Sequence, residues 1–234
     1  TFGAEVRRVP GNYDDAVRAS AEAAAANGWT IVSDTSWPGY DLIPRDVMQG
    51  YAVLALEAEG QGARPTHVFV QGGVGGLAAG VLSWYWETLG ANRPVVVIVE
   101  PDKADCLLAS AIAGRWTTVG GNLDTIMAGL ACGEPSELAW ALLSPGADAF
   151  VSIPDERAAE AMRDLADLGI AAGESGVAGL AGFRAVAGDA RVRAALGLDA
   201  SSRILCIGTE GATDPDIYRT IVGRNAADVE KEAA

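Results

Sequence analysis

The residues with the most evident chemistry are four glycines within five positions, Gly72, Gly73, Gly75 and Gly76, with Val74 between them. They follow an apolar run and precede a helical pattern rich in Ala and Leu. Glycine lets the backbone adopt positive φ values and approach a ligand without a Cβ clash. Backbone N–H groups in such a loop point at the space in front of a helix N-terminus, where the helix dipole is positive. We predict a phosphate-binding loop that works through backbone donors, because it contains neither lysine nor arginine.

Two standard phosphate motifs fit this loop unequally. The P-loop ends in Gly-Lys-Ser/Thr, whereas Gly76 is followed by Leu77 and Ala78. The dinucleotide fingerprint instead requires an acid about 20 residues on, at the end of the next strand, and Glu100 lies near that distance. A nucleotide-dependent oxidoreductase with Glu100 as the ribose-binding acid therefore stays open, as does a tight turn without any ligand.

Composition narrows the class of protein. The 234 residues include 17 basic and 31 acidic side chains, a net charge of −14, which argues against nucleic acid or an anionic membrane as partner. No run approaches ~20 uninterrupted apolar residues, so we expect no transmembrane helix. The absence of a signal-peptide pattern and the low cysteine content predict a cytoplasmic protein. The single histidine, His67, is expected to be packed and hydrogen-bonded, and we predict no metal site.

Strand-like and helix-like segments alternate along the chain, which predicts an α/β fold with an open, mostly parallel sheet flanked by helices. Ligands of such sheets bind at the carboxyl ends of the strands, where the glycine loop lies. The predicted strands are 29–33, 67–70, 94–100, 149–153 and 203–207, and the predicted helices are 12–27, 43–59, 77 onward, 104–113, 124–130, 136–143, 154–168 and 175–187.

Seven segments, in order, resemble the diaminopropionate ammonia-lyases: NYDD, SDTSWPGY followed by IPRDVMQGY, QGGVGGLA, VEPDKADC, TIMAGLACGEP, GESGVAGL and TEGATD. These are pyridoxal-phosphate (PLP) enzymes of the tryptophan-synthase-β class, fold type II. The resemblance implies α,β-elimination of 2,3-diaminopropionate, a small amino-acid substrate, to pyruvate and ammonia. It also implies PLP as cofactor and a homodimer. The nearest alternative is a threonine or serine dehydratase.

The resemblance also assigns roles to individual residues. It makes Gly72–Gly76 the cradle of the PLP phosphate and Thr209 the partner of the pyridine nitrogen. A neutral hydroxyl there leaves the nitrogen largely unprotonated, which suits β-elimination. Glu174 and Ser175 match the stretch beside the cofactor ring, and Asp34 matches an active-site carboxylate that holds an ammonium group or assists proton transfer. Plain alternatives stay open: a helix cap for Thr209, an N-cap for Ser175 and a solvated loop residue or Asx-turn for Asp34.

Two cysteines, Cys106 and Cys132, fall within the matching segments. By resemblance they approach each other near the mouth of the active site, either as a disulfide or as two separately buried thiols. A disulfide would be unusual in a reducing cytoplasm. Cys206, within the last predicted strand, is expected to be a core residue.

The expected departure from the family concerns lysine. PLP enzymes of this kind need a lysine that forms a Schiff base with the cofactor. The chain has only Lys103 and Lys231, and neither matches the family's position. We therefore expect an incomplete chain, inactive alone, that lacks the N-terminal part of the fold and associates with that part or with a second copy. A non-catalytic phosphate- or cofactor-binding remnant is the alternative.

This expectation divides the chain into three parts. Residues 1–42 would be a remnant of the small domain, residues 43–223 the large PLP-binding domain, and residues 224–234 a mobile tail.

Overall fold

The computed structural model describes residues 3–232 and contains a four-stranded, fully parallel sheet in the order β3-β2-β1-β4. The strands are β1 (His67–Gln71), β2 (Val95–Pro101), β3 (Ala149–Ile153) and β4 (Ile204–Cys206). From β1 the chain moves outward through β2 to β3 and then returns to the opposite side of β1 as β4. Loops leaving β1 and β4 therefore diverge, which creates a crevice at the carboxyl edge of the sheet. The predicted α/β class is confirmed.

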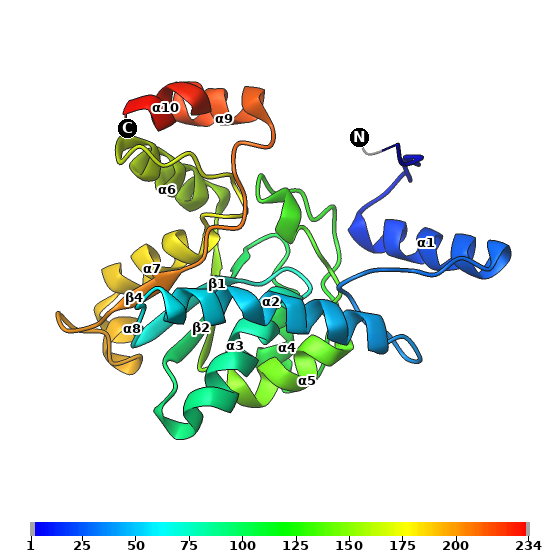
Figure 1. The fold of residues 1–234 in the computed structure, drawn as a ribbon, viewed down its shortest axis with the longest axis horizontal. Helices are drawn as coiled ribbons and strands as arrows, with labels where there is room; N and C mark the ends of the chain where they lie inside the picture. Colours follow the sequence, from blue (N-terminus) through cyan, green and yellow to red (C-terminus); the bar gives the residue numbers. More distant parts are fainter. Residues whose placement is uncertain (1–2, 233–234) are drawn as a thin grey trace.

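Helices cover both faces of this sheet (Figure 1). Alternation along β1 separates the two cores, because Val68 and Val70 pack on one side and Phe69 on the other, all completely buried. The helices of the first side are α2 (Leu42–Gly60), α3 (Gly76–Leu89), α4 (Cys106–Ala113) and α5 (Glu137–Gly146). On the second side, α6 (Asp155–Asp167) and α7 (Ala178–Gly188) pack on the sheet. Helix α8 (Ala190–Ala195) packs against α7, and α9 (Pro215–Val222) and α10 (Ala226–Glu232) pack against α6.

Helix α1 (Tyr13–Asn27) lies at the edge of the molecule, away from the sheet (Figure 1). Asn12 and Asp15 form a reciprocal capping box that fixes its start. Asp14 Oδ2 accepts a hydrogen bond from the N–H of Gly133 at 3.1 Å, which joins α1 to the loop before α5. The proposed division into domains at residue 42 stays a prediction.

Two predicted elements are wrong for tertiary reasons. Segment 29–33 forms no strand, because none of the described residues supplies a pairing partner, and Val32 is 76% exposed. Segment 124–130 forms only a single 3₁₀ turn, Ala128–Leu130. There the Asp155 carboxylate accepts hydrogen bonds from the Thr125 hydroxyl and from the N–H of Ile126, which holds the backbone outside a helical path.

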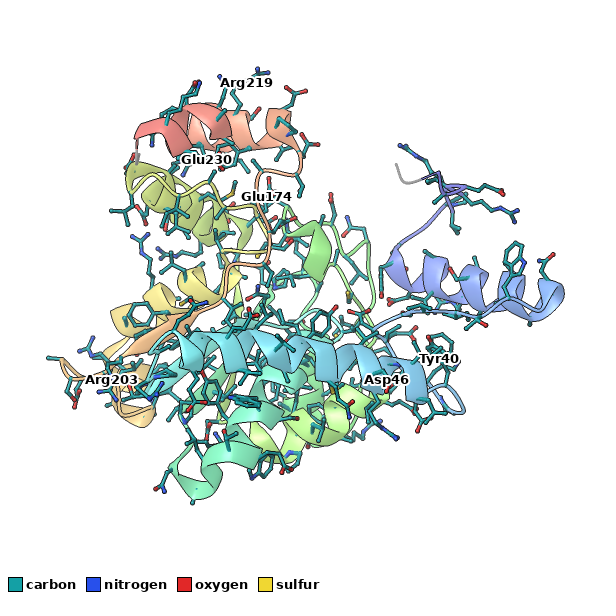
Figure 2. The ribbon with its side chains drawn as sticks, in the orientation of Figure 1. Tyr40, Asp46, Glu174, Arg203, Arg219 and Glu230 are labelled. Atoms are coloured by element: carbon teal, nitrogen blue, oxygen red, sulfur yellow. The ribbon has the colours of Figure 1, made fainter. Side chains whose placement is uncertain are left out.

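The C-terminal region, predicted to be mobile from residue 224, includes helix α10. Val229 on this helix is completely buried, whereas charged side chains such as Arg219 and Glu230 cover α9 and α10 (Figure 2). Residues 233–234 lie outside the described residues, and the mobility of the tail stays a prediction. Within residues 3–232, no helix has both the length and the apolar character needed to span a membrane.

Candidate active site

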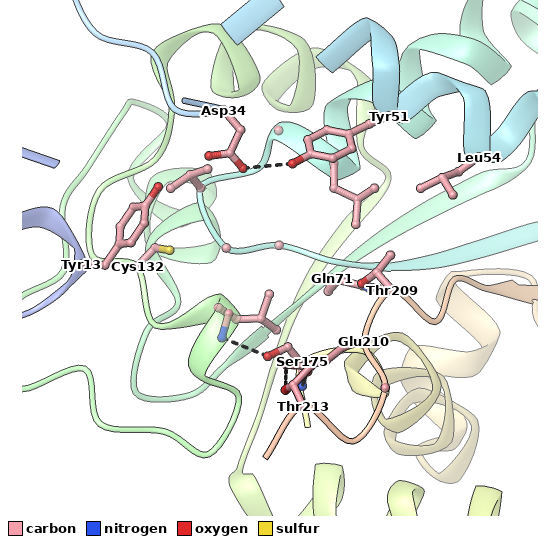
Figure 3. A pocket seen from close by; sticks show the side chains of 18 residues that line it. Tyr13, Asp34, Tyr51, Leu54, Gln71, Cys132, Ser175, Thr209, Glu210 and Thr213 are labelled. Carbon is pink, nitrogen blue, oxygen red and sulfur yellow. Dashed lines mark hydrogen bonds between the residues drawn. The ribbon is translucent and has the colours of Figure 1, made fainter. Parts of the chain in front are cut away.

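A cavity of about 610 Å³ opens at the carboxyl edge of the sheet, between the loops that follow β1 and β4 (Figure 3). Seven of the nine predicted site residues line it: Asp34, Gly72, Gly73, Val74, Gly76, Ser175 and Thr209. Gly75 and Glu174 do not. The predicted site residues therefore meet in the crevice at the carboxyl edge of the sheet, although Asp34 and Thr209 lie 175 positions apart in the sequence.

The glycine loop forms one wall of the cavity and leads directly into α3. Gly73 and Gly75 have φ values of +59° and +99°, which glycine adopts without a Cβ penalty. The backbone N–H groups of Gly73, Gly76 and Leu77 have no acceptor among residues 3–232. All three residues line the cavity. Free donors at a helix N-terminus form a binding site for an anionic group such as a phosphate.

Gly75 contributes to this loop from behind. A Cβ there would lie 3.0 Å from both Ala139 Cβ and Leu143 Cδ1, so the residue faces the core beneath the loop. Gly75 therefore shapes the glycine loop without lining the cavity.

Thr209 lies across the cavity from the glycine loop, directly after β4. Its Oγ1 accepts a hydrogen bond of 2.7 Å from Gln71 Nε2, which also donates to the carbonyl of Ile207 at 2.9 Å. Thr209 is not the cap of α9, because the Asp214 side chain accepts the N–H groups that a cap would bind. A hydroxyl remains available to a ligand at this end of the cavity.

Asp34 lies half-buried near two tyrosines, Tyr51 from α2 and Tyr13 from α1 (Figure 3). The Tyr51 hydroxyl donates to Asp34 Oδ2 at 3.4 Å. Burial, and then the negative charge of Asp34, raise the pKa of both phenols. Both tyrosines therefore stay neutral donors around a carboxylate that faces the cavity.

Ser175 and Glu174 differ in their surroundings. Ser175 Oγ accepts the N–H of Gly129 at 3.0 Å, so Ser175 is not the N-cap of α7, which begins at Ala178. Glu174 is buried behind the cavity wall, and its Oε1 has no partner among the described residues. Burial, with the nearby charge of Glu210, raises the pKa of Glu174.

Glu210 closes the far end of the cavity. Its Oε2 accepts the N–H groups of Ser175 at 2.6 Å and of Gly176 at 3.2 Å. The loop after β4 is thereby fixed to the turn before α7, and this carboxylate is already satisfied by backbone donors.

Glu100 does not face the cavity. It is completely buried, and its two oxygens accept the N–H groups of Leu107 at 2.9 Å and Leu108 at 2.8 Å at the start of α4. Burial raises the pKa of Glu100 to about 8. A ribose cannot reach this side chain, so the interpretation of Glu100 as a nucleotide-binding acid is wrong.

The cysteines are free thiols, so the disulfide suggested by resemblance is not formed in this structure. Cys106 is completely buried and its Sγ donates to the carbonyl of Gly73 at 3.7 Å, whereas Cys132 lies in the cavity wall. Burial raises the pKa of the Cys132 thiol to about 12 and that of Cys106 still further. Both side chains are therefore protonated and weakly nucleophilic here.

His67 is buried as predicted, with Nε2 at 2.8 Å from the carbonyl of Leu196 and Nδ1 at 2.9 Å from the Thr66 hydroxyl. It lies at the amino end of β1 and takes no part in the cavity.

The polar side chains of the cavity that sequence reasoning missed are Tyr13, Tyr51, Gln71, Glu210 and Thr213. Gln71 and Glu210 directly adjoin predicted site residues, so position at a strand's carboxyl end could have indicated them. The two tyrosines lie within the matching segments NYDD and IPRDVMQGY, which could have indicated them, although the packing of α1 and α2 brings them to the cavity.

A PLP molecule fits part of this site. The free N–H groups match its phosphate, and the Thr209 hydroxyl matches its ring nitrogen. The residues do not supply an amine: Lys103 pairs with Asp155 at 2.8 Å, Lys231 is exposed on α10, and neither lines the cavity.

Comparison with known proteins also shows similarity to PLP-dependent enzymes. The chain is 44% identical to the diaminopropionate ammonia-lyase of Escherichia coli strain K12 over 94% of its own length and 58% of that relative. It resembles the Escherichia coli diaminopropionate ammonia lyase in complex with an aminoacrylate–PLP azomethine reaction intermediate, with a TM-score of 0.81 at 41% identity, covering 92% of this chain and 57% of that one. The biosynthetic L-threonine dehydratase of Escherichia coli is 29% identical over 78% of this chain and 34% of its own length.

The chain thus spans somewhat more than half the length of the curated lyases it matches. Residues 1–210 match the family described as "Pyridoxal-phosphate dependent enzyme", which is nine-tenths of the sequence. Because this match covers most of the sequence and the fold is that of the solved lyases, the chain belongs to the family of pyridoxal-phosphate dependent enzymes.

Proposed function

We propose that this protein acts as a PLP-dependent ammonia-lyase that converts 2,3-diaminopropionate to pyruvate and ammonia by α,β-elimination. One observation carries the proposal: a single cavity holds free backbone donors at the glycine loop, an uncharged hydroxyl at Thr209 and a carboxylate at Asp34. The 44% identity to a diaminopropionate ammonia-lyase supports the choice of reaction.

The residues divide the work between cofactor and substrate. PLP, when bound, supplies the electron sink for the α-carbanion of an amino acid. The N–H groups of Gly73, Gly76 and Leu77 bind its phosphate, and the Thr209 hydroxyl binds its ring nitrogen. A neutral partner at that nitrogen moderates the electron sink, which favours elimination over transamination.

Asp34 is proposed to bind or deprotonate an amino group of the substrate. 2,3-Diaminopropionate carries two amino groups, whereas serine and threonine carry a hydroxyl at the β-position. A carboxylate flanked by neutral tyrosines favours the diamine, because its negative charge attracts an ammonium group. Threonine dehydratase, the second candidate, is supported only by a relative at 29% identity.

A lysine must come from outside the cavity lining for this chemistry to proceed. We infer that it belongs to another segment or to another polypeptide that closes over the cavity. The protein without that lysine would bind the cofactor without a covalent bond, which is the non-catalytic alternative. A homodimer and a cytoplasmic location are part of the same proposal, and the low cysteine content supports the location.

The deciding experiment is the intact mass of the purified protein after incubation with PLP and borohydride reduction, under denaturing conditions. We expect an unmodified chain of 24.0 kDa, and a reduced PLP adduct only on a co-purifying polypeptide or a longer chain. An adduct on Lys103 would contradict this assignment of the lysine. Pyruvate release from 2,3-diaminopropionate, compared with 2-oxobutyrate release from threonine, then distinguishes the two lyases in the complete assembly.

A further inference from the structure

The side chain of Gln71 connects the two loops that form the cavity. It ends β1, immediately before the glycine loop, and is only 3% exposed. Its Nε2 donates both hydrogens across the crevice, to the Ile207 carbonyl and to the Thr209 hydroxyl. One amide therefore holds the loop after β4 against the end of β1, at the point where the strand order reverses.

The orientation of this amide is determined by its partners. A carbonyl such as that of Ile207 only accepts hydrogen bonds, so the nitrogen of Gln71 must face it. The Oε1 atom then points away and has no partner among residues 3–232. A buried amide oxygen without a partner is unfavourable, so Gln71 is a poor choice for packing alone. The two hydrogen bonds that its Nε2 donates therefore explain why a glutamine occupies this position.

The consequence concerns the proton of Thr209. Because Thr209 Oγ1 already accepts from Gln71, its own O–H is left to donate, and none of the described residues accepts from it. Oγ1 is also less able to accept from a charged N–H in the cavity, since Gln71 occupies one of its lone pairs.

We propose that Gln71 is a positioning residue that makes Thr209 a donor, so that the cavity selects a heteroaromatic ring nitrogen in its unprotonated form. This inference rests on the proposed function and deepens it, because it names the residue that directs the Thr209 proton towards the cofactor ring. It acts through Thr209 and involves no contact between Gln71 and the ring.

The experiment uses pyridoxine 5′-phosphate labelled with ¹⁵N in the ring. This compound has no aldehyde, so its binding needs no lysine. The ¹⁵N chemical shift is followed against pH in the bound state, and binding is measured by fluorescence. The proteins compared are the wild-type chain, Gln71→Met, Thr209→Val, Thr209→Ser, the double variant Gln71→Met/Thr209→Val, and Gln49→Met as a control at an exposed glutamine outside the cavity.

We expect the ring nitrogen to titrate at a lower pH in the wild-type complex than in free solution. Gln71→Met should weaken binding ~5-fold, about the effect of one lost hydrogen bond, and should move the titration towards that of the free compound. Gln49→Met should behave as wild type. Thr209→Ser keeps a hydroxyl and should restore the lowered titration that Thr209→Val loses. In the Thr209→Val background the Gln71→Met change should add nothing, because both residues act through one hydroxyl.

Three results from the variants would overturn the inference. If Gln71→Met binds pyridoxine 5′-phosphate and its ring nitrogen titrates as in the wild-type complex, the inference fails while the proposed function stays intact. An effect of Gln71→Met that persists without the Thr209 hydroxyl would also overturn it. If Gln71→Met does not fold, a wild-type titration in Thr209→Val, at an exposed position, is equally decisive against it. Failure of the wild-type chain to bind pyridoxine 5′-phosphate would instead overturn the proposed function together with the inference.

Discussion

Burial and hydrogen bonding act in opposite directions on the pKa of the Glu100 carboxyl group. Two backbone N–H groups at the start of α4 favour its charged form, while complete burial disfavours it. Burial prevails and raises the pKa from 4.5 to about 8. The same side chain packs against the glycine loop, since a Cβ at Gly72 would lie 2.6 Å from its Cγ. The group that changes its protonation state therefore lies directly against the glycine loop, the proposed phosphate site.

The raised pKa predicts a pH-dependent stability. The folded protein holds the Glu100 proton more tightly than the unfolded chain, so this group stabilises the fold most below pH 4.5. Its contribution falls as the pH rises from 4.5 and is lost by about pH 8. Urea unfolding across this range should show the decline, and Glu100→Gln should flatten it. The exposed Glu87→Gln is the control and should keep the wild-type slope; an unchanged slope in Glu100→Gln would refute the assignment.

At the level of elements, the proposed anion site consists of the glycine loop and the start of α3. Gly73 has room for a methyl group, with Gly129 O at 3.5 Å as the nearest atom, but its φ of +59° disfavours any Cβ. Gly73→Ala should therefore lower the free energy of unfolding by about 1–2 kcal/mol. It should also weaken binding of pyridoxine 5′-phosphate, since the displaced N–H no longer faces the anion.

Gly114 provides a matched control for this loop. It has φ +65° at the end of α4, an added methyl group there would meet no atom within 4 Å, and the residue lies outside the cavity. Gly114→Ala should lose a similar free energy of unfolding and keep full binding. Equal binding by both variants would show that the loop around Gly73 does not contact the phosphate.

Helix α7 approaches the sheet through glycines spaced one turn apart. A Cβ at Gly179 would lie 2.5 Å from the carbonyl oxygen of Phe69, and one at Gly182 would lie 2.5 Å from Val99 Cγ2. This close approach brings the turn 173–176, with Ser175, to the edge of the cavity.

We expect Gly182→Ala to destabilise the protein by about 1–3 kcal/mol, because the added methyl group overpacks the interface between α7 and β2. Gly188→Ala, at the last position of the same helix, meets open space and should leave the stability nearly unchanged. Denaturant unfolding of the two variants measures the difference, and equal stabilities would argue against tight helix–sheet packing here.

The sequence predicts elements well where the signal is local. The β-branched run of β2 and the segment 149–153 become strands close to or at their predicted bounds, and the glycine loop lies where its spacing indicates. Prediction fails where a residue distant in sequence determines the local structure. The helix predicted for 124–130 does not form because Asp155 accepts hydrogen bonds from Thr125 and Ile126. The contact between Gln71 and Thr209 joins residues 138 positions apart, so no local pattern reveals it.

For the whole molecule, the attachment of α1 decides whether the cavity keeps one of its walls, because Tyr13 on α1 lines it. Two contacts hold the helix to the loop before α5. The Arg18–Glu134 ion pair is about half exposed at both side chains and should contribute little. The buried Asp14 carboxylate, which accepts from the N–H of Gly133, should contribute more.

Asp14→Ala leaves the Gly133 N–H without an acceptor, and we expect it to lower the free energy of docking α1 by about 1–3 kcal/mol. Hydrogen exchange of α1 amides should accelerate roughly 5- to 150-fold, while amides of β1 and β2 keep their protection. Asp14→Asn retains an acceptor oxygen and should exchange nearly as the wild type does, since burial already raises the pKa of Asp14 and favours an uncharged side chain. Arg18→Ala should also change little. Faster exchange in Arg18→Ala than in Asp14→Ala would show that the surface ion pair, and not the buried hydrogen bond, holds this wall of the cavity in place.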